Sequence, residues 1–166
     1  IGSGSLGHLA IAQIGNVLNL ELTHVPYRGG GPLMTDAVGG QVPLAIGTVF
    51  LVNPHVKGGK LRALAVTSAK PSAQLPGVGT VADQGVPGFA ALSWWGVIAP
   101  AGLPLAVKAK LERSIAEAVK APGVNQRLLG LGAAPVGSAS DEFAALIRAE
   151  YAKWGPVIKA AGIRGE

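Results

Sequence analysis

The chain has 166 residues, of which 49% are apolar, 14% charged and 5% aromatic, with 25 Gly, 12 Pro and no Cys. This composition excludes a disordered chain and fits one ordinary domain, or a lobe with part of another, whose core is built mainly from Ala, Val, Leu and Ile. The lack of Cys excludes disulfides, thiolate metal sites and a Cys nucleophile, and the net charge of +5 is too scattered to favour nucleic acid.

The first half of the chain alternates apolar runs with short helical patterns. Apolar residues at helical spacing follow a Gly/Ser loop at residues 2–5. Pro32 suits the first position of a second helix, which stops at Val38 before two glycines. Such alternation indicates an α/β layer with a parallel sheet. We predict helices over 6–17, 32–38 and 49–56, and strands over 22–25, 42–46 and 61–66.

The second half is helical after a loop-rich stretch over residues 71–88 and an extended aromatic run over 92–99. Residues 105–119 and 124–131 form two of the predicted helices. The last helix begins near Ser140, a candidate N-cap, and ends at Gly162. No apolar run is long enough to cross a membrane. The apolar stripe that we expect to be buried on the last helix consists of Phe143, Ile147, Tyr151, Trp154 and Ile158.

The Gly/Ser loop that precedes the first helix is a candidate anion site. Ser3, Gly4 and Ser5 place two hydroxyls and free backbone N–H groups at the positive end of a helix. The alternative is an ordinary N-cap in which the glycines ease the turn. The loop lacks the Gly-Lys-Ser/Thr ending of a nucleotide-binding loop.

Two further loops follow predicted strands and open helices, where ligands bind in open α/β sheets. In the first, over residues 27–32, Tyr27 could line a pocket and Arg28 could pair with a carboxylate or face solvent. In the second, Thr48 could donate to a carboxylate or simply cap the next helix.

No catalytic or metal-binding pattern is present in the sequence. His8, His24 and His55 fit no standard metal spacing. His8 either contributes to the candidate site or orients its helix, and the other two are expected on the surface or in the core. Asp36 and Asp83 are expected on helix surfaces. Trp94 and Trp95 either touch a ligand or belong to the core.

Several segments, taken in order, resemble one known family. Residues 24–42 are similar to the block from H-V-P-Y-K-G to G-G-Q-V of the Bug receptors, the extracytoplasmic solute-binding receptors of tripartite tricarboxylate transporters. Residues 58–68 and 75–85 resemble the next two blocks, and residues 95–104 resemble the W-x-G-x-x-A-P-A-G-T-P segment. Because the order is kept over the whole chain, the sequence looks like the carboxyl-terminal half of such a receptor.

The resemblance implies an α/β fold of the type II periplasmic-binding-protein class, whose two lobes close on a ligand. Residues 1–92 would form the second, ligand-binding lobe, residues 93–99 would cross the hinge, and residues 100–166 would be helices that return to the first lobe. Most of that first lobe would precede Ile1, and we therefore expect a fragment.

The resemblance also implies a function without catalysis, cofactor or metal. A receptor of this family captures a small organic acid (a dicarboxylate, a tricarboxylate, an amino acid or an aromatic acid) in the bacterial periplasm for transporter membrane subunits. The signal peptide would lie outside this chain. The residues that map onto the ligand-facing loops, or lie beside them, are Ser3, Gly4, Ser5, His8, Tyr27, Gly29, Gly30 and Thr48.

Departures from the family pattern leave the ligand open. Pro43 stands where the family usually has Asp, and Gly47 with Thr48 replaces a commoner Asp-containing turn. The alternatives to a transporter receptor are an orphan receptor that feeds a sensory partner, a truncated fragment that binds nothing, and a small-acid hydrolase, for which no base is paired with Ser3 or Ser5.

Overall fold

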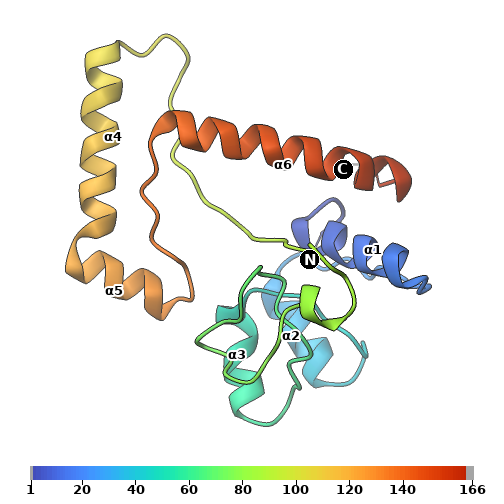
Figure 1. Cartoon of the computed structure of the whole chain (residues 1–166). Helices are drawn as coiled ribbons and strands as arrows, with labels where there is room; N and C mark the ends of the chain where they lie inside the picture. The colour runs from blue at the N-terminus through green and yellow to red at the C-terminus, as the bar shows by residue number, and fades with distance from the viewer. Residues whose placement is uncertain (1, 164–166) are drawn as a thin grey trace. The chain divides into compact units, whose positions relative to one another are not determined.

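Helices and extended connections make up the described part of the chain, which is residues 2–163 of a computed structural model (Figure 1). The chain divides into two units. Unit 1 comprises Ile1–Ser93 with Trp154–Glu166, and unit 2 comprises Trp94–Lys153. The predicted lobe and hinge boundaries stay predictions. Residues 1 and 164–166, which they include, lie outside the described range.

Helix α1 (Leu6–Leu18) forms where the apolar spacing predicts it. Its start is capped because the Ser5 side chain accepts a hydrogen bond from the His8 N–H. It ends at Asn19, whose left-handed backbone (φ 52°) suits Asn better than most residues and lets its N–H reach the carbonyls of Gly15 and Asn16. The helix buries Leu9 and Ala10 and leaves Val17 exposed.

Helices α2 (Gly30–Val38) and α3 (Val49–Lys57) pack against each other. Both end at glycines, Gly39 and Gly58, as the sequence predicts. Helix α2 begins two residues earlier than expected, so that Pro32 is its third residue and not its first. This position is still within the first turn, where the missing N–H of proline leaves no intrahelical bond unmade.

The prediction of three strands is wrong, because these segments form no regular β structure. Residues 22–25, 42–46 and 61–66 lie outside any ladder, and the β pairing in the described range is one isolated parallel bridge between Val66 and Thr80. An apolar β-branched run favours extended dihedrals, but a strand also needs a neighbour hydrogen-bonded along several consecutive residues. That neighbour is a non-local feature, which the run itself does not specify.

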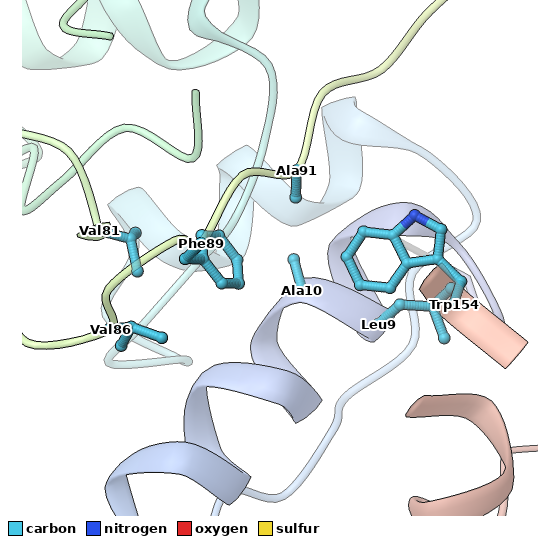
Figure 2. Packing of buried hydrophobic residues seen from close by; sticks show 7 residues of the cluster. All are labelled: Leu9, Ala10, Val81, Val86, Phe89, Ala91 and Trp154. Carbon is cyan, nitrogen blue, oxygen red and sulfur yellow. The ribbon is translucent and has the colours of Figure 1, made fainter. Parts of the chain in front are cut away.

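The core of unit 1 joins segments that are far apart in the sequence (Figure 2). The Trp154 indole, from the C-terminal helix, lies beside Leu9 and Ala10 of α1, and Phe89 lies on the other side of Ala10. Trp154 is only 6% exposed. As composition predicts, most of the cluster is aliphatic, and its buried members are Leu9, Ala10, Val81, Val86, Phe89, Ala91 and Trp154.

Thr80 is 0% exposed and is held by Asp83. The Thr80 hydroxyl donates to Asp83 Oδ2 at 2.7 Å and accepts from the Asp83 N–H at 3.0 Å, while the Thr80 N–H donates to the same carboxylate at 3.3 Å. This reciprocal capping opens the short 3-10 helix η1 (Ala82–Gln84). Asp83 is exposed, as expected, and the Thr-x-x-Asp spacing of residues 80–83 is the local signal from which this cap could have been read.

Replacing Thr80 by Val is expected to lower the free energy of unfolding by about 1–3 kcal/mol, because the near-isosteric side chain leaves the Asp83 N–H and carboxylate without their buried partner. Urea denaturation followed by circular dichroism measures the change. The matched control is Thr23→Val, at an exposed position. Equal stabilities for the two variants would show that the Thr80 hydroxyl is not needed.

Unit 2 contains α4 (Leu105–Lys120), α5 (Pro122–Gly130) and the first part of α6 (Ser140–Ala160), and α4 packs against α5. All residues of unit 2 lie within the described range, and none of their side chains is buried. The rings of Trp94 and Phe143 contact each other edge to face, with their centroids 5.3 Å apart. Trp94 is 41% exposed and Trp95 is 77% exposed, so the core alternative for these two tryptophans is wrong.

The apolar stripe of α6 is buried in part only. Trp154 is buried and Phe143 is half-buried, but Ile147 is exposed and Tyr151 is 84% exposed. Helical spacing identifies which side chains share a face. It does not say whether another segment covers that face. Within the described residues, no helix is long and apolar enough to cross a membrane.

Candidate functional site

Each of the predicted site residues lies at or near a helix N-terminus in unit 1. Gly29 and Thr48 are the N-cap residues of α2 and α3, and Gly30 is the first residue of α2. Their backbone conformations leave the first N–H groups of each helix without an intrahelical acceptor. The remaining positions are Ser3, Gly4 and Ser5 before α1, His8 in its first turn, and Tyr27 ahead of α2.

The N-termini of α2 and α3 meet at the side chain of Leu51. A Cβ atom built on Gly30 would lie 2.5 Å from Leu51 Cδ2, and one built on Gly47 would lie 3.4 Å from the same atom. Gly30 therefore permits the close approach of the two helix starts. The exposed Thr48 side chain makes no capping hydrogen bond. Thr48, the N-cap of α3, directly follows Gly47, and Gly47 and Gly30 both lie close to the Leu51 side chain.

The Gly/Ser loop has the geometry of a capped turn. The Ser5 N–H donates to the Gly2 carbonyl at 3.1 Å, and Gly4 adopts a left-handed backbone with φ of 71°. The His8 N–H donates to Ser5 Oγ at 3.3 Å, which is the capping alternative. The Ser5 hydroxyl hydrogen is not used by this bond, so the residue can cap the helix and still donate to a ligand.

His8 connects this loop to the segment that leads to Tyr27. The Gly4 N–H donates to His8 Nδ1 at 3.2 Å, which places the ring proton of neutral His8 on Nε2. The ring stacks on His24 with centroids 3.7 Å apart and planes 8° apart. Burial, followed by the neighbouring His24, lowers the pKa of His8. Sequence reasoning missed this pair because the two residues are distant in sequence and match no motif.

The two histidines line a groove of about 510 Å³. Its wall is formed by one face of α1 and the extended segment after it, with Asn16, Asn19 and Glu21 as further polar groups. A second groove of about 490 Å³ lies along α2 and α3 and is lined by Met34, Leu51 and His55 among others. In the described residues, no three His, Asp or Glu side chains are grouped so that they could hold a metal ion.

The lowered pKa of His8 predicts a loss of stability in mild acid. Between its ordinary value of 6.5 and its lower folded value, the unfolded chain binds more protons than the folded chain. The free energy of unfolding therefore falls as pH falls through this window, and the His8 contribution levels off below it. Protonation also removes the Nδ1 acceptor that holds Gly4.

Thermal unfolding of the wild type and His8→Asn across this pH range tests the prediction. The variant should lose part of the acid-dependent fall in melting temperature. His55→Asn, in the second groove, is the control for removal of an imidazole elsewhere in the chain. Parallel curves for all three proteins would contradict an effect of His8.

Tyr27 and Asp36 form a side-chain pair in the loop that enters α2. The Tyr27 hydroxyl donates to Asp36 Oδ2 at 2.9 Å. Burial, then the hydrogen bond to Asp36 and its charge, raise the pKa of Tyr27. Asp36 was expected on the helix surface, but it is half-buried and accepts this hydrogen bond. Arg28 is exposed.

Comparison with family profiles finds a match to the tripartite tricarboxylate transporter family receptor (TctC), over residues 1–163. A Pseudomonas sp. (strain P51) relative, named the UPF0065 protein in the tcbD-tcbE intergenic region, is 40% identical over 95% of this chain and 47% of its own length. Protein BugT of Bordetella pertussis is 33% identical over 97% of this chain and 49% of its own.

The chain thus spans about half the length of these relatives. A Pseudomonas knackmussii relative, the UPF0065 protein in the clcB-clcD intergenic region, is different, because its match at 32% identity covers 94% of its own length.

Solved structures also match this chain over nearly its whole length. The protein described as R. palustris Rpa4515 with adipate matches with a TM-score of 0.85 and 35% identity, over 96% of this chain and 54% of that one. The periplasmic binding protein BugD matches with a TM-score of 0.78 and 28% identity, over 98% and 55%. These neighbours confirm the predicted fold class, that of the periplasmic solute-binding proteins.

Proposed function

This chain belongs to the family of tripartite tricarboxylate transporter receptors, and from that premise we propose that it supplies the ligand-binding lobe of a receptor for a small organic carboxylate. The observation that carries the proposal is the meeting of the α2 and α3 N-termini at Leu51. Two helix starts side by side present several amides and two positive dipole ends to one anion. One solved neighbour is described with adipate, and because adipate is a dicarboxylate it supports the same class of ligand.

The proposed carboxylate site uses backbone amides and hydroxyls in place of a buried cation. Gly29 and Gly30 let a ligand approach the backbone closely, since neither carries a side chain. Thr48 would donate through its free hydroxyl, and Ser3 and Ser5 would donate from the loop before α1. The net charge of +5 would assist the approach of anions without selecting among them.

We place this receptor in the bacterial periplasm, with transporter membrane subunits as its partners, on the strength of the family and of neighbours described as periplasmic. We propose no catalytic role, since the family is described as one of receptors.

Thermal shift against dicarboxylates, tricarboxylates, amino acids and aromatic acids tests the function. The assay is run on this chain and on the product of its full reading frame, because a ligand that binds only the folded state raises the melting temperature. A shift with at least one acid class is expected for at least one of the two proteins. If no acid shifts either protein, the carboxylate proposal fails.

Thr48→Val tests the assigned donor by calorimetry with the acid that gives the largest shift. Loss of a hydrogen bond to a charged group, at about 1.5–3 kcal/mol, predicts roughly a 10- to 100-fold weaker affinity. Thr23→Val, at another exposed threonine, should bind like the wild type.

A further inference from the structure

The Tyr27–Asp36 pair closes a loop around the start of α2. Tyr27 lies three residues before the helix, and Asp36 lies in its last turn. Their 2.9 Å hydrogen bond therefore spans the turn at residues 28–29 and most of the helix. Both residues are half-buried, so the bond is partly shielded from competing water.

The position of Asp36 is unfavourable for the helix by itself. A carboxylate near a helix C-terminus faces the negative end of the helix dipole, which is destabilising. No basic residue is present in the last turn of α2 to offset this. The Asp36 carboxylate accepts the hydrogen bond of the Tyr27 hydroxyl, so Asp36 contributes by fixing the position of Tyr27.

The turn that follows Tyr27 has little in its own sequence to order it. Three consecutive glycines, residues 29–31, follow Tyr27, and glycine has more backbone freedom to lose on ordering than any other residue. The Gly29 and Gly31 positions have open space around them, with no atom within 4 Å of a Cβ built there. Side-chain packing at those two positions therefore does not order the turn, whereas a bond from Tyr27 to the body of α2 restricts it at its start.

We propose that Asp36 is a positioning residue, which holds Tyr27 and thereby preorganises the Gly29–Gly30–Gly31 amides at the start of α2 for an anion. The inference rests on the proposed function and adds a residue that does not itself touch the ligand. The cost of ordering the turn is met by Tyr27 and Asp36 before binding, which raises affinity without a new ligand contact. The Tyr27 hydroxyl proton is committed to Asp36 and is therefore not a donor to the ligand.

The experiment uses Tyr151→Phe as its background, since the chain has two tyrosines and Tyr151 is exposed. In this chain of 166 residues, the ultraviolet absorbance of tyrosinate then reports Tyr27 alone. The variants are Asp36→Asn, which keeps an oxygen acceptor, Asp36→Ala, which removes it, and Tyr27→Phe. Asp141→Ala, on an exposed residue of α6, controls for the loss of one negative charge.

Asp36→Ala and Tyr27→Phe are each expected to weaken the affinity for the best acid of the panel by about tenfold, and their double variant by no more, because both remove the same bond. Asp36→Asn should bind within a few-fold of the background. Both Asp36 variants should lower the tyrosinate midpoint, because both remove the negative charge. Recovery of affinity in Asp36→Asn alone separates positioning from charge.

NMR order parameters of the Gly29, Gly30 and Gly31 amides supply a readout without ligand. They should fall from about 0.85 towards 0.6 in Asp36→Ala and stay high in Asp36→Asn. If the background binds an acid and Asp36→Ala binds it equally well, the inference is overturned and the receptor function stands. If no acid binds at all, the proposed function fails, and unchanged order parameters in Asp36→Ala would overturn the positioning role separately.

Discussion

Replacing Trp154 by Ala is expected to lower the free energy of unfolding of unit 1 by about 3–5 kcal/mol, which is a large part of the stability of an ordinary domain. The indole is 6% exposed and packs on Leu9 and Ala10, so its removal leaves a cavity between α6 and α1 (Figure 2). Helix α1 follows the Gly/Ser loop, and a loosened α1 would also disturb that candidate anion loop.

Trp95→Ala is the matched control for this prediction. It makes the same chemical change at a side chain that is 77% exposed, and surface truncations usually alter stability by about 0.5 kcal/mol or less. Urea denaturation followed by far-ultraviolet circular dichroism compares the two variants without depending on the removed fluorophore. Comparable midpoints for the two variants would mean that Trp154 does not support the core.

Gly30→Ala is expected to destabilise the protein by about 1–3 kcal/mol relative to Gly31→Ala, because the new Cβ would overlap Leu51. The distance from that Cβ to Leu51 Cδ2 is 2.5 Å, whereas Gly31 has nothing within 4 Å. Both changes exchange Gly for Ala in the first turn of α2, so their helix-propensity gains are similar and cancel in the comparison. If the proposed site is correct, Gly30→Ala also weakens carboxylate binding, since it separates the α2 and α3 N-termini.

Leu51→Ala provides the rescue for this clash. In that background the cost of Gly30→Ala relative to Gly31→Ala should largely vanish, and a double-mutant cycle of unfolding free energies measures the coupling between positions 30 and 51. An undiminished cost in the Leu51→Ala background would locate the effect of Gly30 in the backbone and not in this contact.

The helices and the family could be read from the sequence because their signals are local or ordered along the chain. Helical spacing and the Gly/Ser, Gly-Gly and Gly-Gly-Pro punctuation located α1, α2 and α3 to within about two residues. The ordered motif blocks identified the receptor family that the profile then matched. The candidate ligand residues were also placed correctly at helix starts, while their binding role stays a prediction.

The pairings inside the candidate site were beyond the sequence. Nothing local relates His8 to His24 or Tyr27 to Asp36, and each pair depends on how the chain returns past α1 or α2. Asp36 was expected on a helix surface because its sequence neighbours do not reveal that a tyrosine nine residues earlier lies against it. The meeting of Gly30 and Gly47 at Leu51 is of the same kind.

The amino-acid sequence by itself determined where this chain forms α1, α2 and α3, to within about two residues, and which family it belongs to, because these depend on neighbours within a few positions and on motif order. Tertiary structure alone decided which apolar faces are covered. It buries Trp154 and leaves Tyr151 84% exposed on the same predicted stripe, and it leaves three extended apolar runs without a ladder. Burial and strand pairing need a partner from a distant part of the chain, and the free energy that selects that partner is shared among many weak contacts.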